Sequence, residues 1–155
     1  MARLSDLPEW ERPHHLDKIS ALPDYGPTPF ASGPPLNQRR VAIVTTAGLH
    51  RRDDRPFEMG SADYRIIPTD SAAADLIMSH ISVNYDRSGF QEDVNVVFPI
   101  ERLRELEADG TIGSISEFHY SFMGASQGHT LEGKARELAR LMKQDAVDAV
   151  LLTPV

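Results

Sequence analysis

The chain has 155 residues, a length that fits one domain built around one hydrophobic core. Hydrophobic residues make up 41% and charged residues 25%, a balance that excludes wholesale disorder and fibrous classes. The formal net charge of -7 argues against nucleic-acid binding, and the lack of cysteine excludes disulfides and thiol nucleophiles within these residues. No apolar stretch approaches the roughly 20 residues that span a bilayer, so we expect a cytoplasmic protein.

Residues 1–39 hold seven of the eleven prolines. Because proline fixes φ and donates no backbone hydrogen bond, we expect a proline-rich extended arm with one short helix, followed by an α/β domain over residues 40–155. Trp10, Leu16 and Ile19 place apolar side chains along this arm. They predict that the arm packs on the domain or on a neighbouring subunit.

The domain begins with short β-branched runs that alternate with helical patterns. Val41 to Thr46 and Tyr64 to Ile67 predict strands, whereas Ala74 to Ser79 is compatible with a strand or a helix. The run VNVVF, residues 94–98, predicts another strand. A helix is expected from Pro99 to about Asp109, because apolar residues recur there every three positions.

The last third of the chain continues the alternation. Ser116 to Phe122 predicts a strand, and Thr130 to Gln144 predicts an amphipathic helix with Thr130 as its N-cap. Ala149 to Val155 is a continuous apolar run, typical of a strand covered on both faces. The order of elements favours a mainly parallel sheet flanked by helices, a Rossmann-like three-layer α/β fold. In such sheets ligands bind at the carboxyl ends of the strands.

Polar residues follow the first predicted strand. Thr45, Thr46 and His50 are candidates for binding a substrate or orienting a nucleophile. The alternative is turn chemistry, because threonines at strand ends often bond to nearby backbone groups.

Two histidines are candidate acid–base residues. His80 opens a polar loop that contains Asp86, and a histidine there suits a general acid that Asp86 could orient. The alternative is a histidine bonded to the loop backbone beside a solvated carboxylate. Strand alternation sends His119 and Ser121 to one face and Tyr120 to the other. His119 is then a pocket residue or a satisfied core histidine, while Tyr120 and Ser121 are candidates for substrate binding.

Metal and nucleotide sites are not expected. The six histidines show no HxxxH or HExxH spacing, and no cysteine is present. The sequence also contains neither a P-loop nor a GxGxxG motif.

Three blocks resemble a known family. They are VAIVTTAGLH with RPFEMGSADYRIIP, then SHISVNYDRSGFQEDVNVVFPIERLRELEADGTIGS, and finally HYSFMGA with DAVDAVLLTPV. Together they cover about residues 40–155 and are similar to the selenoprotein B family of the glycine, sarcosine, betaine and D-proline reductases, especially its D-proline-reductase-like branch.

The resemblance implies a selenolate or thiolate directly after Val155, because the matching strand of the family runs into a selenocysteine or cysteine. It implies reductive cleavage of a carbon–nitrogen bond in an amino acid or related amine. It also implies a companion subunit that carries a pyruvoyl group, with no cofactor in this chain, and a homo-oligomer or a complex with that subunit.

The sequence ends with the segment that precedes the family's nucleophile. We expect truncation at a selenocysteine codon, and a natural short paralogue is the alternative. Two other functions stay open: a non-catalytic binding or assembly subunit that keeps the fold, and a lyase or isomerase. The latter would use His80 with Asp86 or His119.

Overall fold

A computed structural model describes residues 3–24, 26–27, 31–82 and 85–155, and the chain divides into two compact units, Met1–Ala31 and Ser32–Val155. The first unit contains a 3-10 helix, η1 (Leu4–Asp6), and helix α1 (Arg12–Ser20), which has a proline in its first turn. Trp10, Leu16 and Ile19 are exposed, so the packing of this arm stays a prediction. Among the described residues, no helix combines the length and the apolar character needed to cross a membrane.

The second unit is built on a five-stranded sheet with β1 (Arg40–Thr45) in its interior. One edge of β1 pairs in parallel with β5 (Ser114–Ile115) and β6 (Phe118–Ser121), and the other edge pairs in parallel with β7 (Ala149–Thr153). Strand β3 (Arg65–Pro68) runs antiparallel to β6. The α/β class is confirmed, but the sheet is mixed, so the prediction of a mainly parallel sheet was right only in part.

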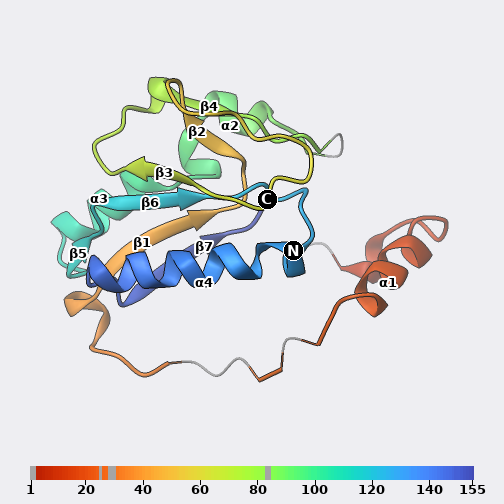
Figure 1. Cartoon of the computed structure of the whole chain (residues 1–155), viewed down its shortest axis with the longest axis horizontal. Coiled ribbons are helices and arrows are strands. Elements are labelled where there is room, and N and C mark those ends of the chain that lie inside the picture. Colours follow the sequence, from red (N-terminus) through yellow and green to blue (C-terminus); the bar gives the residue numbers. More distant parts are fainter. Residues whose placement is uncertain (1–2, 25, 28–30, 83–84) are drawn as a thin grey trace. The chain divides into compact units, whose positions relative to one another are not determined.

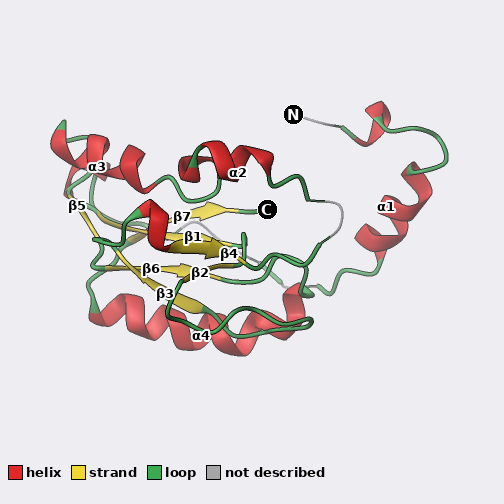
Figure 2. Cartoon of the chain, turned by 90° about the horizontal axis from the view of Figure 1, so that it is seen from above, coloured by secondary structure: helices red, strands yellow, loops and turns green. Residues whose placement is uncertain are grey.

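Helices lie on both faces of this sheet (Figure 2). Helix α4 (Gly128–Gln144) covers one face and packs through Leu138 and Met142. Helices α2 (Ser88–Glu92) and α3 (Ile100–Ala108) lie on the other face, where Ile100 and Leu103 enter the larger core cluster. The predicted helix after Pro99 is confirmed, and Gly110 beyond its end has a φ of 77° that suits glycine.

A second, two-stranded sheet joins β2 (Leu49–Arg51) and β4 (Leu76–Met78) in antiparallel pairing. The ambiguous segment 74–79 thus contributes a short strand, which follows the 3-10 helix η3 (Ala73–Asp75). Strand β2 was not predicted. Another 3-10 helix, η2 (Leu36–Gln38), precedes β1.

The strand predicted at residues 94–98 is wrong, because this segment forms the 3-10 helix η4 (Val94–Val96). The Asp93 side chain accepts a hydrogen bond from the Asn95 N–H at 2.8 Å and caps the turn. The helical turn buries Val94, Val97 and Phe98 together in the core. A strand would have sent Val97 and Phe98 to opposite faces.

Two details at the C-terminal end also differ from prediction. Helix α4 begins earlier than expected, with Gln127 as N-cap, and the Thr130 hydroxyl donates to the Gln127 carbonyl instead of capping the helix. Strand β7 is confirmed, but Val150, Leu151 and Leu152 are exposed, so it is not covered on both faces.

Backbone geometry at the end of α4 sets the start of β7. The Val147 N–H donates to the Met142 carbonyl at 2.9 Å, and the Ala146 N–H donates to the Lys143 carbonyl at 3.2 Å. These two bonds form a Schellman motif, in which the residue after the C-cap adopts a left-handed conformation. Ala146 has a φ of 54°, where glycine is the usual residue.

Candidate functional site

The carboxyl ends of β1 and β7 meet the segment after β6 at Gly124. A Cβ atom on Gly124 would lie 2.5 Å from the Val155 carbonyl oxygen, 2.8 Å from the Thr46 carbonyl oxygen and 3.0 Å from His80 Nε2. Glycine permits this convergence because it has no side chain. We call Thr46, His80, Gly124 and Val155 the carboxyl-edge cluster. Figure 1 shows the C-terminal residue at the end of the sheet toward which β1 and β6 point.

Thr45 and Thr46 hold the segment that follows β7. The Thr46 hydroxyl accepts a hydrogen bond from the Val155 N–H at 2.8 Å and lies 3.3 Å from the Val155 carbonyl oxygen. The fully buried Thr45 hydroxyl contacts the Thr153 carbonyl at 3.3 Å and accepts from the Ala47 N–H at 3.1 Å. The two threonines therefore fix where the chain leaves the sheet.

His80 carries a polar atom with no partner. Its side chain is almost fully buried, with the residue 5% exposed, and Nδ1 accepts a hydrogen bond from the Ser82 N–H at 3.3 Å. The ring proton of the neutral imidazole therefore sits on Nε2. Among the described residues Nε2 has no hydrogen-bond partner. An unpaired buried donor costs about 1–3 kcal/mol of free energy, so binding of a hydrogen-bond acceptor next to Nε2 is favourable.

The surroundings of His80 favour its neutral form. Burial lowers the pKa of His80 below 6.5, and the positive charge of Arg87 lowers it further. The Arg87 guanidinium donates to the His80 carbonyl, and the Tyr85 ring lies 4.9 Å from the imidazole. A neutral imidazole donates a hydrogen bond from Nε2 but is a poor proton donor. The geometry thus fits a hydrogen-bond donor better than the general acid expected from the sequence.

Asp86 lies next to this site in the sequence without facing His80. Its carboxylate is exposed and accepts a hydrogen bond from the Ser88 N–H at 2.9 Å, which is the main reason that the pKa of Asp86 is lowered. Within the described ranges, no hydrogen bond or ion pair joins Asp86 to His80.

His50 and Ser121 are buried and hold backbone segments together. His50 Nδ1 lies 2.7 Å from the Arg51 carbonyl and therefore carries the proton, so Nε2 accepts from the Ser79 hydroxyl at 2.6 Å. The Ser121 hydroxyl accepts from the Leu49 N–H at 2.8 Å. Through Ser79, the segment after β1 is joined to the residue that precedes His80.

His119 lies in the core with both ring nitrogens engaged. Nδ1 accepts a hydrogen bond from the Ile43 N–H at 2.9 Å, and Nε2 donates one to the Thr69 hydroxyl at 3.0 Å. Ile43 lies at the point of β1 that faces the gap between β5 and β6, so the imidazole takes the place of a strand partner there. The ring meets Phe98 edge to face, with centroids 5.5 Å apart. Burial, and after it the charge of Arg104, lowers the pKa of His119 to about 4. These contacts describe a histidine that supports the sheet.

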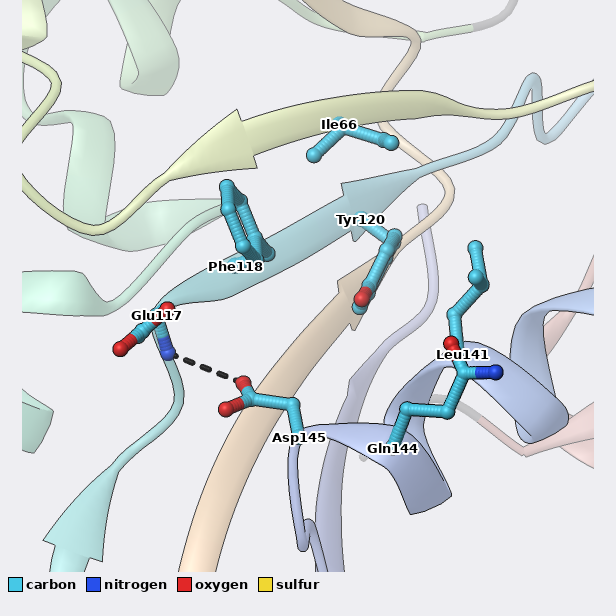
Figure 3. Close-up of a pocket in the computed structure, with 7 residues that line it drawn as sticks. All are labelled: Ile66, Glu117, Phe118, Tyr120, Leu141, Gln144 and Asp145. Atoms are coloured by element: carbon cyan, nitrogen blue, oxygen red, sulfur yellow. Dashed lines mark hydrogen bonds between the residues drawn. The ribbon is translucent and has the colours of Figure 1, made fainter.

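Tyr120 points to the opposite face of β6 from His119 and Ser121, as strand alternation predicts, and lines a separate cavity of about 340 Å³ (Figure 3). Burial raises the pKa of Tyr120. Because β6 starts and α4 ends beside this cavity, it lies at the amino ends of the parallel strands, away from the carboxyl-edge cluster. Its lining residues are Ile66, Glu117, Phe118, Tyr120, Leu141, Gln144 and Asp145.

The structure therefore brings Thr46 and His80 together in the carboxyl-edge cluster. Thr45 and His50 are buried and bond to the segments that carry Val155 and His80. Tyr120 lies apart from this cluster and lines the separate cavity. Sequence reasoning missed Gly124 as a part of this site. A single glycine after a strand carries no distinguishing pattern. In the described part of the chain, no group of three or more acidic or histidine side chains is arranged to hold a metal ion.

An α/β fold with its polar cluster at the carboxyl edge of a sheet has the site layout of many α/β enzymes. Residues 29–155 match the family model described as glycine/sarcosine/betaine reductase selenoprotein B (GRDB). The chain belongs to this family.

Curated relatives agree with this assignment. The chain is 37% identical over 121 residues to D-proline reductase subunit gamma of Acetoanaerobium sticklandii, covering 76% of this chain and 49% of that protein. It is 35% identical over 126 residues to sarcosine reductase complex component B subunit beta of Peptoclostridium acidaminophilum, covering 76% and 28%. The chain thus spans about half or less of the length of these relatives. No solved structure matched it.

Proposed function

We propose that this chain forms part of a reductase that cleaves a carbon–nitrogen bond in an amino acid or related amine such as proline, glycine, sarcosine or betaine. The family match and the names of the relatives support the reductase class. The observation that carries the proposal is the buried Nε2–H of His80 beside Val155, which has no hydrogen-bond partner among the described residues. An unpaired donor at the carboxyl edge of the sheet suits the binding of an anion.

In this proposal the reactive selenolate or thiolate occupies the position directly after Val155. The position that a Cβ atom would take on Gly124 lies 2.5 Å from the Val155 carbonyl oxygen and 3.0 Å from His80 Nε2. The residue after Val155 therefore begins close to the imidazole. A hydrogen bond from Nε2–H stabilises the anion and lowers its pKa. The effect matters most for a thiol, whose unperturbed pKa is about 8.5, because the anion is the nucleophile.

The proposed chemistry balances with a dithiol as reductant. The anion forms a bond to the carbon that bears the substrate's positively charged ammonium nitrogen, and the carbon–nitrogen bond breaks with its electron pair leaving on nitrogen as the neutral amine. One thiol of the reductant then attacks the selenium or sulfur, and the carbon takes the electron pair and a proton. The second thiol releases the selenolate or thiolate, so the dithiol becomes a disulfide and two electrons pass to the substrate.

Partners and location follow from the same proposal. The relatives are named as subunits or complex components, which supports a companion subunit for this chain. On the family resemblance, that subunit carries a pyruvoyl group that holds the substrate amine. A selenolate or thiolate needs reducing surroundings, so the proposal includes a cytoplasmic location. It also treats the sheet with its flanking helices as a Rossmann-like three-layer core.

The coding DNA beyond the Val155 codon tests the proposal. A UGA codon or a cysteine codon directly after Val155, followed by an open frame, is the expected result. A UAA or UAG codon with no readable frame beyond it would contradict the proposal and favour a non-catalytic binding or assembly subunit.

A lyase or isomerase gains no support from the geometry. It would need an acid and a base in one pocket, yet within the described ranges no hydrogen bond joins His80 to Asp86 or to His119. Both ring nitrogens of His119 are already engaged in the core.

A further inference from the structure

The strand pair β2–β4 carries His80 to the carboxyl-edge cluster, since His80 comes two residues after β4. This pair is attached to the end of β6. The Leu49 N–H donates a hydrogen bond to the Ser121 hydroxyl at 2.8 Å. The Gly48 N–H donates to the Phe122 carbonyl at 2.9 Å. Ser121 is fully buried, and its hydroxyl therefore fixes the start of β2.

The segment between β4 and His80 is in turn attached to β2. The Ser79 N–H donates to the Gly48 carbonyl at 2.9 Å, and the Ser79 hydroxyl donates to His50 Nε2 at 2.6 Å. Gly48 has a φ of 66°, and a Cβ atom on it would lie 3.0 Å from the His80 backbone nitrogen and 3.1 Å from His80 Cα. The His80 backbone therefore packs directly against Gly48, and the two bonds of Ser79 set its direction.

His50 contributes direction to this arrangement more than apolar burial. The residue is buried, and its two ring nitrogens bond to the Arg51 carbonyl and the Ser79 hydroxyl. A leucine would fill a similar space without the free-energy cost of burying polar nitrogens. A hydrogen bond, unlike an apolar contact, weakens steeply as its angle departs from linearity. The bond to Ser79 thus holds the next residue, His80, in one orientation.

We propose that His50 is a positioning residue for His80: through the Ser79 hydroxyl it aims His80 Nε2 at the position directly after Val155. The inference rests on the proposed function, because the anion at that position is what requires an aimed donor. Such a donor must be held within about 0.5 Å of its productive place, and supporting hydrogen bonds provide that precision. Arg87 holds the same residue from its other side by donating to the His80 carbonyl.

The titration of the His80 ring, followed by nuclear magnetic resonance in the full chain, tests the positioning without any nucleophile. Burial lowers the pKa of His80 below 6.5 in the wild type. The pKa should rise toward 6.5 in Ser79→Ala and in His50→Leu, because a ring that is no longer held in place regains contact with water. His50→Gln should keep most of the lowering, since its amide oxygen can accept from the Ser79 hydroxyl near the position of Nε2. The same His80 pKa in the wild type, Ser79→Ala and His50→Leu would overturn the proposal.

The thiol pKa of a cysteine appended after Val155 tests the consequence for the anion. It should rise in Ser79→Ala by about half of the rise caused by His80→Ala. Thr69→Ala is the matched control, because it also removes a hydroxyl bonded to a buried histidine, His119, but beside the start of β6. It should leave both the His80 pKa and the thiol pKa unchanged.

The two readouts separate the positioning from the proposed function. A thiol pKa that responds to His80→Ala but to neither Ser79→Ala nor His50→Leu would overturn the positioning role alone. A thiol pKa that does not respond to His80→Ala would contradict the proposed function. In that case the His80 titration still decides whether His50 holds the ring.

Discussion

Replacing His119 with asparagine should remove a pH-dependent part of the free energy of unfolding. Asparagine keeps an acceptor near the position of Nδ1 for the Ile43 N–H, but it cannot take up a proton. It also loses the ring contact with Phe98 and the bond to Thr69. We therefore expect the variant to be less stable than the wild type at pH 7.5, by about 2–4 kcal/mol.

The pH dependence follows from the lowered pKa. The pKa of His119 falls from 6.5 to about 4 in the folded chain, so between these values the unfolded chain binds a proton that the folded chain does not. The contribution of neutral His119 to stability is complete above pH 6.5 and is lost as the pH falls toward 4. At 1.36 kcal/mol per pH unit, the full loss is about 3 kcal/mol.

Urea unfolding followed by circular dichroism at pH 7.5, 6.5, 5.5 and 4.5 measures this term. Asp145, whose pKa is lowered in the folded chain, loses its own contribution at low pH in both proteins, so the difference between them isolates His119. The stability gap between wild type and variant should shrink by about 2–3 kcal/mol on going from pH 7.5 to 4.5. A gap that stays constant across this range would refute the reasoning.

Three further predictions concern the backbone and the carboxyl-edge cluster. Ala146→Gly should raise the free energy of unfolding by about 1 kcal/mol in urea titrations, because glycine adopts the left-handed φ without strain; a loss of stability would contradict this. Gly113→Ala should destabilise the fold by about 2 kcal/mol, because its Cβ atom would lie 2.6 Å from neighbouring backbone. The control Gly133→Ala in α4 places its Cβ atom where no other atom lies within 4 Å, so it should not destabilise the fold. Similar losses of stability in the two variants would contradict the close packing at Gly113. Thr46→Val removes the hydroxyl that accepts the Val155 N–H, so hydrogen exchange of the Val155 amide should become faster. Thr46→Ser keeps a hydroxyl and should keep this amide protected. Equal exchange rates in the two variants would rule out the Thr46 hydroxyl as the group that holds Val155.

Periodicity predicted the elements whose side-chain spacing is distinctive. The buried run of β1 and the amphipathic α4 follow directly from their apolar patterns. The strand prediction for residues 94–98 failed because a β-branched run can form either a strand or a 3-10 turn. The hydrogen bond from the Asn95 N–H to the Asp93 side chain favours the turn. The antiparallel direction of β3 was also out of reach, since side-chain pattern carries no information on strand direction.

The site was predicted in part for a similar reason. Polar residues at strand ends singled out Thr46 and His80, because the carboxyl edge of an α/β sheet is the usual place for a ligand. The partners that satisfy the other histidines come from distant segments: Ser79 bonds to His50, and Ile43 bonds to His119. Sequence alone could not distinguish these satisfied histidines from His80, whose buried Nε2 has no hydrogen-bond partner among the residues that the structure describes.

The central claim is that the Nε2–H of His80, which has no hydrogen-bond partner in the described part of the chain, stabilises an anion on the residue after Val155. The direct measurement is the pKa of a cysteine appended after Val155, taken from its alkylation rate as a function of pH. We predict a pKa below the unperturbed value of about 8.5 with His80 present, and a rise of about one unit in His80→Ala. His80→Gln should retain part of the effect, because its amide N–H reaches the position of Nε2. The same thiol pKa in the wild type and in His80→Ala would contradict the account.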